Sequence, residues 1–195
     1  YICKNDEGKI LGFLYIKTEG LDENYSDIQP PFEPKRRLKV GTFKVESTGF
    51  RLGERFIKII FDNALQRNVD EIYMTMFTNR EELSALSALS ARWGFVEHGI
   101  KVTKEKKEAV LVKKMNEYTP ELSARKNFPN IKYNCNKFIL PINPEYHTTL
   151  LPDSKLNNEN EVDFLGHQPH RYALQKVYIS WAPDNGLKSG DLILF

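Results

Sequence analysis

The stretch "VESTGFRLGERFIKIIFDNA", residues 45–64, decides how the first half of the chain folds. It ends an apolar segment, passes through a short polar one, and continues with apolar residues spaced three and four apart. This change of period predicts a strand, a turn and an amphipathic helix that opens near Gly53. The first amide N–H groups of a helix lack intrahelical partners, and the helix dipole places positive charge there. The stretch therefore predicts a binding place for an anionic group such as phosphate.

The segments around this stretch alternate between strand and helix patterns. They predict a hairpin over residues 1–20, strands over 38–47, 70–77, 94–102 and 108–115, and helices over 53–68 and 79–93. Residues 21–37 contain three prolines and mixed charge, which predicts a loop. This order of elements, which runs to about Met115, indicates the α+β class.

Length and composition exclude several classes of protein. The chain has 195 residues, of which 41% are hydrophobic and 28% charged, as in ordinary globular proteins. No apolar run approaches the roughly 20 residues that a membrane-spanning helix needs, so we expect no membrane partner. A net charge of +2 argues neither for nor against nucleic acid. Cys3 and Cys135 lack metal-ligand spacing and favour a reducing, cytoplasmic location without a metal site.

A change of composition near Asn116 predicts a domain boundary. We expect one domain over residues 1–115 and a β-rich domain over 116–195, with strands at 137–142, 176–182 and 190–195. The chain begins and ends within predicted strands, so we expect it to be a piece of a longer protein. The oligomeric state stays open.

Three stretches of the first domain resemble the GNAT family of N-acetyltransferases. "NDEGKILGFLYI", residues 5–16, is similar to the hairpin that precedes the family's cofactor strand. "FKVESTGFRLGERF", residues 43–56, is similar to that strand and its Q/R-x-x-G-x-G/A turn. "LSARWGFVEHG", residues 89–99, is similar to the L-Y-x-x-x-G-F end of the family's following helix. The resemblance implies a mixed sheet flanked by helices, with the family's first strand and first two helices upstream of Tyr1.

The resemblance also implies acetyl-CoA as the cofactor. Backbone N–H groups of Gly53, Glu54 and Arg55 would bind its pyrophosphate, and Arg51 would add charge. Val45 and Ser47 would pair with the pantetheine arm at the end of the cofactor strand.

The implied reaction is direct acetyl transfer to an amine of a small molecule or a protein. A free alkyl amine has a pKa of about 10, so a base must take its proton. Glu46 is the first candidate base and Glu19 the second, while the N–H of Val45 is the candidate donor to the thioester carbonyl. Ser90 stands where many family members carry the tyrosine that protonates the leaving thiolate.

The chain departs from the family pattern at several positions, which keeps an alternative open. Phe50 and Arg55 replace the first and last residues of the turn motif, so only Gly53 fits it, and Ser90 replaces the tyrosine. The alternative is a module that senses acyl-CoA or binds RNA without catalysis.

The end of the chain, "KVYISWAPDNGLKSGDLILF", residues 176–195, resembles strands of PUA-like barrels, including ASCH-type domains. Such a barrel implies RNA as a partner, since aromatic stacking and phosphate contacts suit single strands. The basic and aromatic candidates are Lys132, Tyr133, Lys137, Arg171, Tyr172, Lys176 and Tyr178. The alternative is a β-rich domain whose tyrosines only pack.

Overall fold

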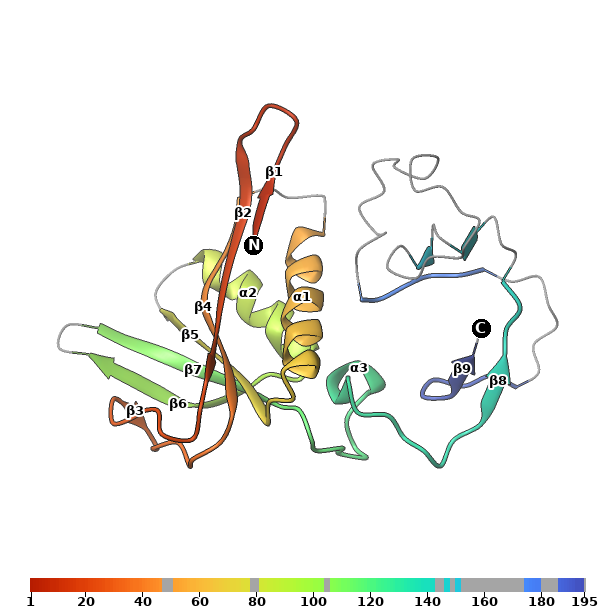
Figure 1. Cartoon of the computed structure of the whole chain (residues 1–195). Helices are drawn as coiled ribbons and strands as arrows, with labels where there is room; N and C mark the ends of the chain where they lie inside the picture. Colours follow the sequence, from red (N-terminus) through yellow and green to blue (C-terminus); the bar gives the residue numbers. More distant parts are fainter. Residues whose placement is uncertain are drawn as a thin grey trace.

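A mixed sheet with two helices packed on it forms the first part of the chain in the computed structural model (Figure 1). The structure describes residues 1–46, 51–77, 81–103, 106–142, 146–147, 150–151, 174–179 and 186–194. The predicted α+β class, with a mixed sheet flanked by helices, is confirmed for this part.

The sheet has seven strands in the order β1-β2-β4-β5-β7-β6-β3. They are β1 Ile2–Lys4, β2 Ile10–Glu19, β3 Ile28–Gln29, β4 Arg37–Val45, β5 Glu71–Phe77, β6 Val96–Thr103 and β7 Lys106–Lys114. The helices are α1 Leu52–Gln66, which follows β4, and α2 Glu81–Arg92, which follows β5. The elements follow the predicted order, except that the predicted loop 21–37 also contains the two-residue strand β3.

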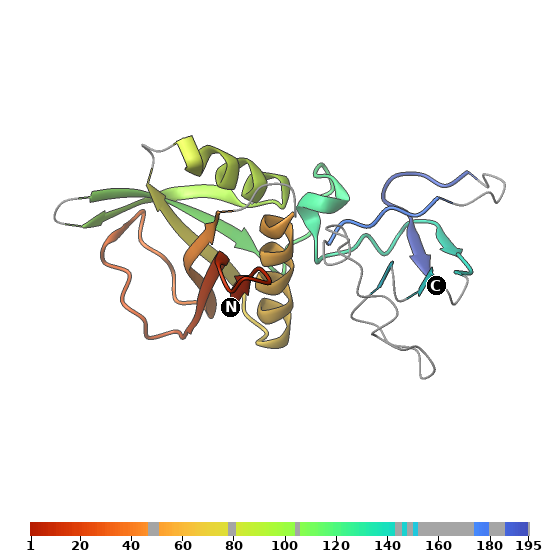
Figure 2. The same ribbon diagram turned by 90° about the horizontal axis from the view of Figure 1, so that it is seen from above.

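Both helices lie against the sheet (Figure 2), and their apolar side chains share one core with it. The buried apolar residues of α1 recur with the helical period that the sequence shows: Leu52, Phe56, Ile57, Ile60, Phe61 and Ala64. Phe61 is fully buried, and its ring lies 6.1 Å from that of Trp93 and 5.1 Å from that of Phe128, measured between centroids. The core therefore extends from the sheet to the short helix α3, Ala124–Asn127.

The loop before β4 covers part of the opposite face of the sheet. Its buried side chains Tyr25 and Ile28, with the half-buried Phe32, form a second apolar cluster with Tyr73, Val110 and Val112. The loop is fixed through β3, which pairs with β6, and through a 2.9 Å contact between His98 Nε2 and the Pro30 carbonyl. Each face of the sheet thus has its own core.

The second part of the chain contains a small parallel sheet. Strands β8 Lys137–Ile139 and β9 Leu192–Leu194 pair in register, so the predicted strands at 137–142 and 190–195 are confirmed over three residues each. The predicted strand at 176–182 is wrong for residues 176–179, which have no regular structure. Its other residues lie outside the described ranges. The PUA-like barrel and the boundary near Asn116 stay predictions.

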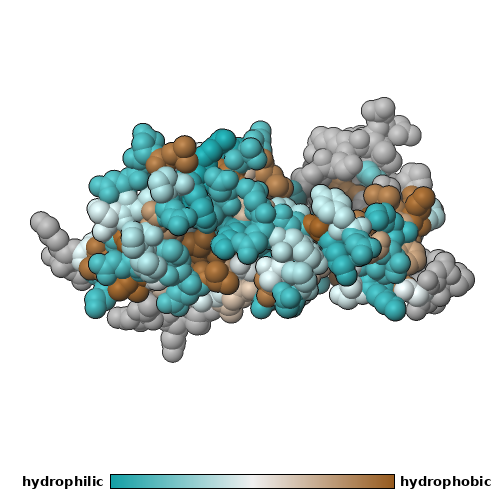
Figure 3. All heavy atoms as spheres, turned by 90° about the horizontal axis from the view of Figure 1, so that it is seen from below, coloured by the Kyte–Doolittle hydropathy of each residue, from teal (hydrophilic) through white to brown (hydrophobic). Residues whose placement is uncertain are grey.

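The face of the molecule that Figure 3 shows is mostly hydrophilic. On the face shown in Figure 3, hydrophobic side chains form small separate groups among hydrophilic ones. Among the described residues, no helix is long and apolar enough to cross a membrane.

Truncation of Phe61 tests the core that joins α1 to α3. We expect Phe61→Ala to lower the free energy of unfolding by about 3–5 kcal/mol, because it leaves a cavity among packed rings. The matched control is Leu65→Ala on the same helix, where the side chain is 51% exposed and the expected change is below about 0.5 kcal/mol. Urea unfolding measures both, and equal changes would contradict the described packing.

A buried lysine makes stability depend on pH. Lys113 on β7 is buried and donates a hydrogen bond to the Lys126 carbonyl at the end of α3. Burial lowers the pKa of Lys113 from 10.5 to about 8. Between these values the unfolded chain binds more protons than the folded one, so this lysine makes the protein more stable as pH rises.

We therefore compare the free energies of unfolding of the wild type and of Lys113→Met. The wild-type value minus the variant value should rise by about 2–3 kcal/mol between pH 7.5 and 10. Tyrosine titration affects both proteins alike and cancels in the difference. Lys107→Met, at an exposed position of the same strand, should keep the wild-type slope. If the free energy of unfolding of Lys113→Met changed with pH as steeply as that of the wild type, another group would be responsible for the pH dependence.

Candidate functional site

The two parallel neighbours of the large sheet, β4 and β5, separate toward their C-terminal ends. They pair from Arg37 opposite Glu71 to Val40 opposite Met74 and no further. Beyond that point β4 continues along β2 as far as Val45, and β5 continues along β7 as far as Phe77. The sheet therefore has an opening, which we call the β4–β5 cleft.

A bulge in β4 lies at the point of separation. Tyr15 faces Thr42 and Ile16 faces Val40, so Gly41 is the extra residue between two regular pairs with β2. A bulge bends its strand and increases the local twist. The bulge at Gly41 thus gives a physical reason for β4 to leave β5 directly after Val40.

The main chain of β4 presents hydrogen-bond donors to this cleft, first at Phe43. Leu14 faces Phe43. Its N–H donates to the Tyr1 carbonyl and its carbonyl accepts from the Tyr1 amino group, both on the far side of β2. In an antiparallel ladder the two facing residues either exchange both bonds or neither, so Phe43 does not bond to Leu14. The N–H of Phe43 therefore points away from β2, toward the cleft.

The same reasoning applies to Val45 at the end of β4. Val45 faces Gly12 on β2. The residue after Val45 bonds to the residue before Gly12, since the N–H of Glu46 donates to the Leu11 carbonyl at 2.9 Å. This is the pattern of a non-hydrogen-bonded pair, so the N–H of Val45 also points toward the cleft. Ser47 would continue the alternation but lies outside the described residues.

An apolar cavity of about 100 Å³ lies in the cleft. It is smaller than the roughly 300–1,000 Å³ of a typical small-molecule site, so it suits a narrow chain rather than a whole cofactor. The residues that line it are Val40, Gly41, Phe43, Met74, Thr75, Met76, Phe77 and Leu86.

Tyr15 lies at the rim of this cleft, on the face opposite the helices. A Cβ atom on Gly41 would stand 2.8 Å from Cδ1 of Tyr15, so the ring lies directly against the Gly41 backbone. Leu14 points into the helix-side core, and alternation along β2 places Tyr15 on the other face. Its side chain is 52% exposed. Neither Tyr15 nor Phe43 carries a sequence signal of its own, but a glycine within a strand pattern, Gly41, marks a close approach of this kind.

The N-terminus of α1 follows β4 and has no cap from Arg51. Arg51 is the N-cap residue in a left-handed conformation, with φ 47° and ψ 30°, and makes no side-chain capping bond. Its guanidinium instead lies 3.7 Å from the Glu54 carboxylate in the first turn. Oε2 of Glu54 is buried without a hydrogen-bond partner among the described residues. The carboxylate suits a helix N-terminus but would repel a phosphate there.

Gly53 and Arg55 both have contacts within the protein at the start of α1, and their role at a cofactor stays a prediction. A Cβ on Gly53 would stand 2.9 Å from Cδ2 of Leu89, so this glycine lets α1 approach α2 closely. The Arg55 side chain is exposed and lines a separate cavity with residues 1–4 of the first hairpin. Its N–H bonds to the Arg51 carbonyl at 3.1 Å, which removes it from the free donors at the helix N-terminus.

Glu46 is exposed at the end of β4, next to the cleft. Its carboxylate lies 2.6 Å from the ammonium of Lys44. The hydrogen bond and charge of Lys44 lower the pKa of Glu46. A carboxylate with a lowered pKa is a weaker general base, and the role of Glu46 stays a prediction.

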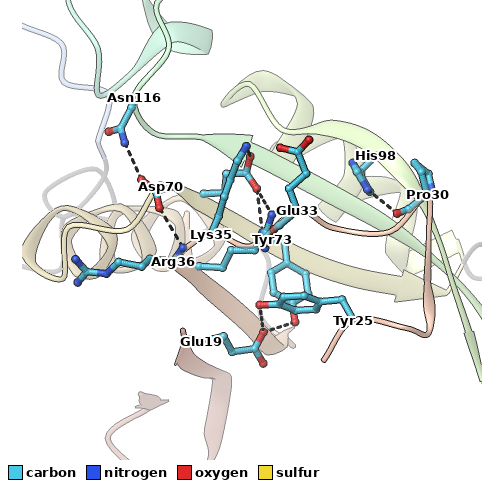
Figure 4. Close-up of polar contacts among 12 residues, drawn as sticks. Glu19, Tyr25, Pro30, Glu33, Lys35, Arg36, Asp70, Tyr73, His98 and Asn116 are labelled. Carbon is cyan, nitrogen blue, oxygen red and sulfur yellow. Dashed lines mark hydrogen bonds and ion pairs between the residues drawn. The ribbon is translucent and has the colours of Figure 1, made fainter. Parts of the chain in front are cut away.

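Glu19, the second candidate base, is buried, with a side chain that is 1% exposed. Figure 4 shows its carboxylate beside Tyr25 and Tyr73. The carboxylate accepts hydrogen bonds from Tyr73 at 2.6 Å and Tyr25 at 3.0 Å, and Lys39 lies 3.4 Å away. Burial raises the pKa of Glu19, but the Tyr73 hydrogen bond and the Lys39 charge outweigh it and the pKa is lowered. Burial and the nearby carboxylate raise the pKa of Tyr25 to about 12. Glu19 therefore ties the loop to the sheet.

A second buried ion pair holds the closed end of β4 and β5. Arg37 and Glu71 face each other across the two strands, with Nε of Arg37 2.9 Å from Oε2 of Glu71, and Lys35 lies 2.7 Å from Oε1. Next to this pair, Asp70 accepts hydrogen bonds from the Arg36 N–H and the Asn116 amide (Figure 4). Both carboxylates therefore have partners within the protein, Glu71 two cations and Asp70 two neutral donors, which indicates a structural role.

Ser90 lies in the interior between α2 and β5. It is fully buried, its hydroxyl donates to the Leu86 carbonyl at 2.8 Å, and Sδ of Met74 lies 3.5 Å away. Leu86 and Met74 line the cleft, so Ser90 lies behind its wall. Its predicted role as the acid stays untested. Within the described ranges, no three His, Cys, Asp or Glu side chains are grouped to hold a metal ion.

Comparison with known proteins gives similarities to solved structures only. No protein-family model and no curated protein sequence matches the chain. The NatC complex bound to Gag peptide and CoA contains a chain that is 18% identical, over 53% of this chain and 60% of that one, with a TM-score of 0.41. Naa20 from Chaetomium thermophilum, in complex with a bisubstrate analogue, is 12% identical over 68% and 70%, with a TM-score of 0.46.

A third similar structure is a GNAT-family acetyltransferase from Listeria monocytogenes 4b F2365. It is 16% identical over 58% of this chain and 63% of that one, with a TM-score of 0.42. The chain thus spans 60% of the length of the NatC chain and 63% of that of the Listeria protein.

Substitution of Glu19 tests its structural role through pH. Its pKa is lowered from 4.5, so its contribution to stability is present above pH 4.5 and is lost as pH falls through the folded-state pKa. We expect Glu19→Gln to lower the free energy of unfolding by about 3 kcal/mol at pH 7. The gap to wild type should narrow below about pH 4.

The matched control is Glu23→Gln, because Glu23 is one-third exposed, with 35% of its side chain accessible, and pairs with Lys17. We expect a change below about 1 kcal/mol for this control. Chemical unfolding between pH 3 and pH 7 measures both variants. A gap for Glu19→Gln that stays constant over this range would contradict an ionised Glu19.

Proposed function

We propose that the chain binds an acyl-CoA, acetyl-CoA in the simplest case, and transfers the acyl group to an amine of a small molecule or protein. The observation that carries the proposal is the free edge of β4: the N–H groups of Phe43 and Val45 point into the β4–β5 cleft, and the N-terminus of α1 follows. A pantetheine arm contains two amides and can pair with a strand edge in the way that an added strand does. A diphosphate suits the helix N-terminus beyond it.

In this proposal β4 and α1 bind different parts of the cofactor. Val45 and Ser47 pair with the pantetheine arm, and the free first-turn amides of Leu52, Gly53 and Glu54 face the diphosphate. The N–H of Phe43, deeper in the cleft, donates to the thioester carbonyl oxygen and stabilises negative charge that develops there. The apolar cavity takes the acyl group.

The acceptor amine must lose a proton before or during attack. Its nitrogen forms a bond to the acyl carbon while the carbon–sulfur bond breaks, and the sulfur takes a proton. Glu46, beside the cleft, is the candidate to accept the amine proton directly or through water. Tyr15 at the rim and Ser90 behind the wall are the candidate hydroxyl donors to the sulfur. Tyr15 is the better placed of the two, because the Ser90 hydroxyl already donates to Leu86.

A second candidate function is acyl-CoA binding without transfer, with RNA held by the C-terminal part and the protein located in the cytoplasm. The buried hydroxyl of Ser90, the lowered pKa of Glu46 and the Glu54 carboxylate near the predicted diphosphate position favour it. The free edge of β4 is common to both candidates.

Thermal melting with acetyl-CoA tests the cofactor site. A ligand at 100 times its dissociation constant adds about 2.7 kcal/mol, which for a chain of this size corresponds to a midpoint shift of roughly 5–10 °C. Val45→Pro removes one of the two N–H groups that point into the cleft and spares the ladder with β2, so we expect it to lose most of this shift. Val45→Thr keeps the N–H and should keep the shift.

If millimolar acetyl-CoA does not shift the melting midpoint of the wild type, both candidate functions are wrong. If the shift is present, release of free thiol in the presence of a panel of amines separates them. Thiol release above the rate without amine indicates transfer, and a shift without any release indicates the binding module.

A further inference from the structure

A larger cavity lies where α2 ends and α3 begins, apart from the β4–β5 cleft. Its volume is about 550 Å³, and it shares no lining residue with the cleft among the described residues. Leu86 of α2 lines the cleft, whereas Arg92, the last residue of the same helix, lines this cavity. The described residues that line it are Arg92, Trp93, Ser123, Ala124, Arg125, Lys126, Phe128, Gln175 and Ser189.

The charge of this cavity has one sign. Arg92, Arg125 and Lys126 contribute positive charges, and no described acidic residue lines the cavity. Elsewhere in the structure, basic side chains such as Lys35, Lys58 and Lys114 form close ion pairs with carboxylates. Neither Arg92 nor Lys126 has an ion pair with a described residue. Like charges around one cavity repel one another, and a bound anion would offset that repulsion.

One of the three cations is held in place by neutral neighbours. The guanidinium of Arg125 donates a hydrogen bond to Oε1 of Gln175 at 2.7 Å and lies 5.9 Å from the centre of the Trp93 ring. These contacts orient the group without neutralising its charge. An oriented guanidinium is the side chain best suited to phosphate, because its N–H groups match phosphate oxygens in pairs.

The remaining lining matches a ligand with a flat apolar part. The half-buried Phe128 and the largely buried Trp93 supply aromatic carbon at the wall, and Ser123 and Ser189 supply hydroxyl groups. The volume falls in the range of about 300–1,000 Å³ that small-molecule sites occupy. Phosphate, an aromatic ring and polar hydroxyl groups occur together in nucleotides.

We infer that this cavity binds a phosphorylated ligand of nucleotide size, with Arg92, Arg125 and Lys126 at the phosphate. The site is independent of the proposed acyl transfer, since the cleft uses main-chain amides of β4 and the cavity uses side chains from α2 and α3. Loss of one function therefore leaves the other measurable.

Calorimetric titration with ATP, on protein free of acetyl-CoA, tests this inference. We expect saturable binding that weakens as salt rises from 50 to 200 mM, because charge supplies much of the affinity. The double variant Arg92→Ala/Lys126→Ala should weaken binding at least tenfold. Both side chains are exposed, so it should fold normally and keep the wild-type melting response to acetyl-CoA. The control Lys107→Ala removes an exposed charge from β7 and should change the affinity less than twofold.

Three results would overturn the inference. The first is no ATP binding at millimolar concentration. The second is equal affinity in wild type and the double variant. The third is a short single-stranded RNA that binds more than ten times as tightly as ATP and loses that affinity in the double variant, which would make the cavity part of a nucleic-acid surface. The acetyl-CoA melting shift is scored separately, so failure of the acyl-CoA proposal is distinguishable from each of these.

Discussion

The incomplete pairing of β4 with β5 is the constraint on which the rest of the structure depends. At the closed end, the strands are held by ladder pairing from Arg37 to Val40 and by the buried ion pair of Arg37 with Glu71. Breaking such a pair by removing one partner would leave an uncompensated buried charge. At the open end the bulge at Gly41 directs β4 away from β5, and among the described residues β2 is the strand that still pairs with it. Two strands fixed at one end and separate at the other necessarily present unpaired main-chain groups between them.

The position of α1 follows from the same strands. A Cβ at Gly12 would stand 2.8 Å from Leu52 and 3.0 Å from Phe56, so β2 receives the first turn of the helix only because Gly12 has no side chain. Gly53 likewise lets α1 pack closely against Leu89 of α2, because it has no side chain. The helix N-terminus is thus held beside the end of β4 by close packing on both sides. This explains a glycine at position 53 without any ligand, and a cofactor would use a geometry that packing already fixes.

The sequence was sufficient for the order of elements in the first part of the chain, because each long element repeats its apolar residues with a clear period. Helix α1 and strand β5 are examples, with buried residues at the expected spacing. The two-residue strand β3 and the bulge at Gly41 have no period to read, since they arise from pairing between distant segments. The burial of Glu19 could not be predicted from the sequence, because its partners Tyr25 and Tyr73 come from the loop and from β5. At 176–179 the apolar pattern suggested a strand, but β propensity depends on a neighbouring strand to pair with.

The candidate site was predictable in kind but not in detail, and the reason is physical. Main-chain amides carry no sequence signature, so the donors of Phe43 and Val45 follow only from the register with β2. Side-chain charge does carry a signature, yet its meaning depends on partners: Arg51 lies beside Glu54, whereas Arg92 and Lys126 line a cavity without acids among the described residues. The two places should therefore respond differently to salt. Neutral amides at a strand edge bind through short hydrogen bonds that salt screens little, whereas three cations around a cavity act through a field that salt weakens. Helix α2 lines both places, the cleft with Leu86 and the cavity with Arg92. Only the cavity uses a charged side chain of this helix.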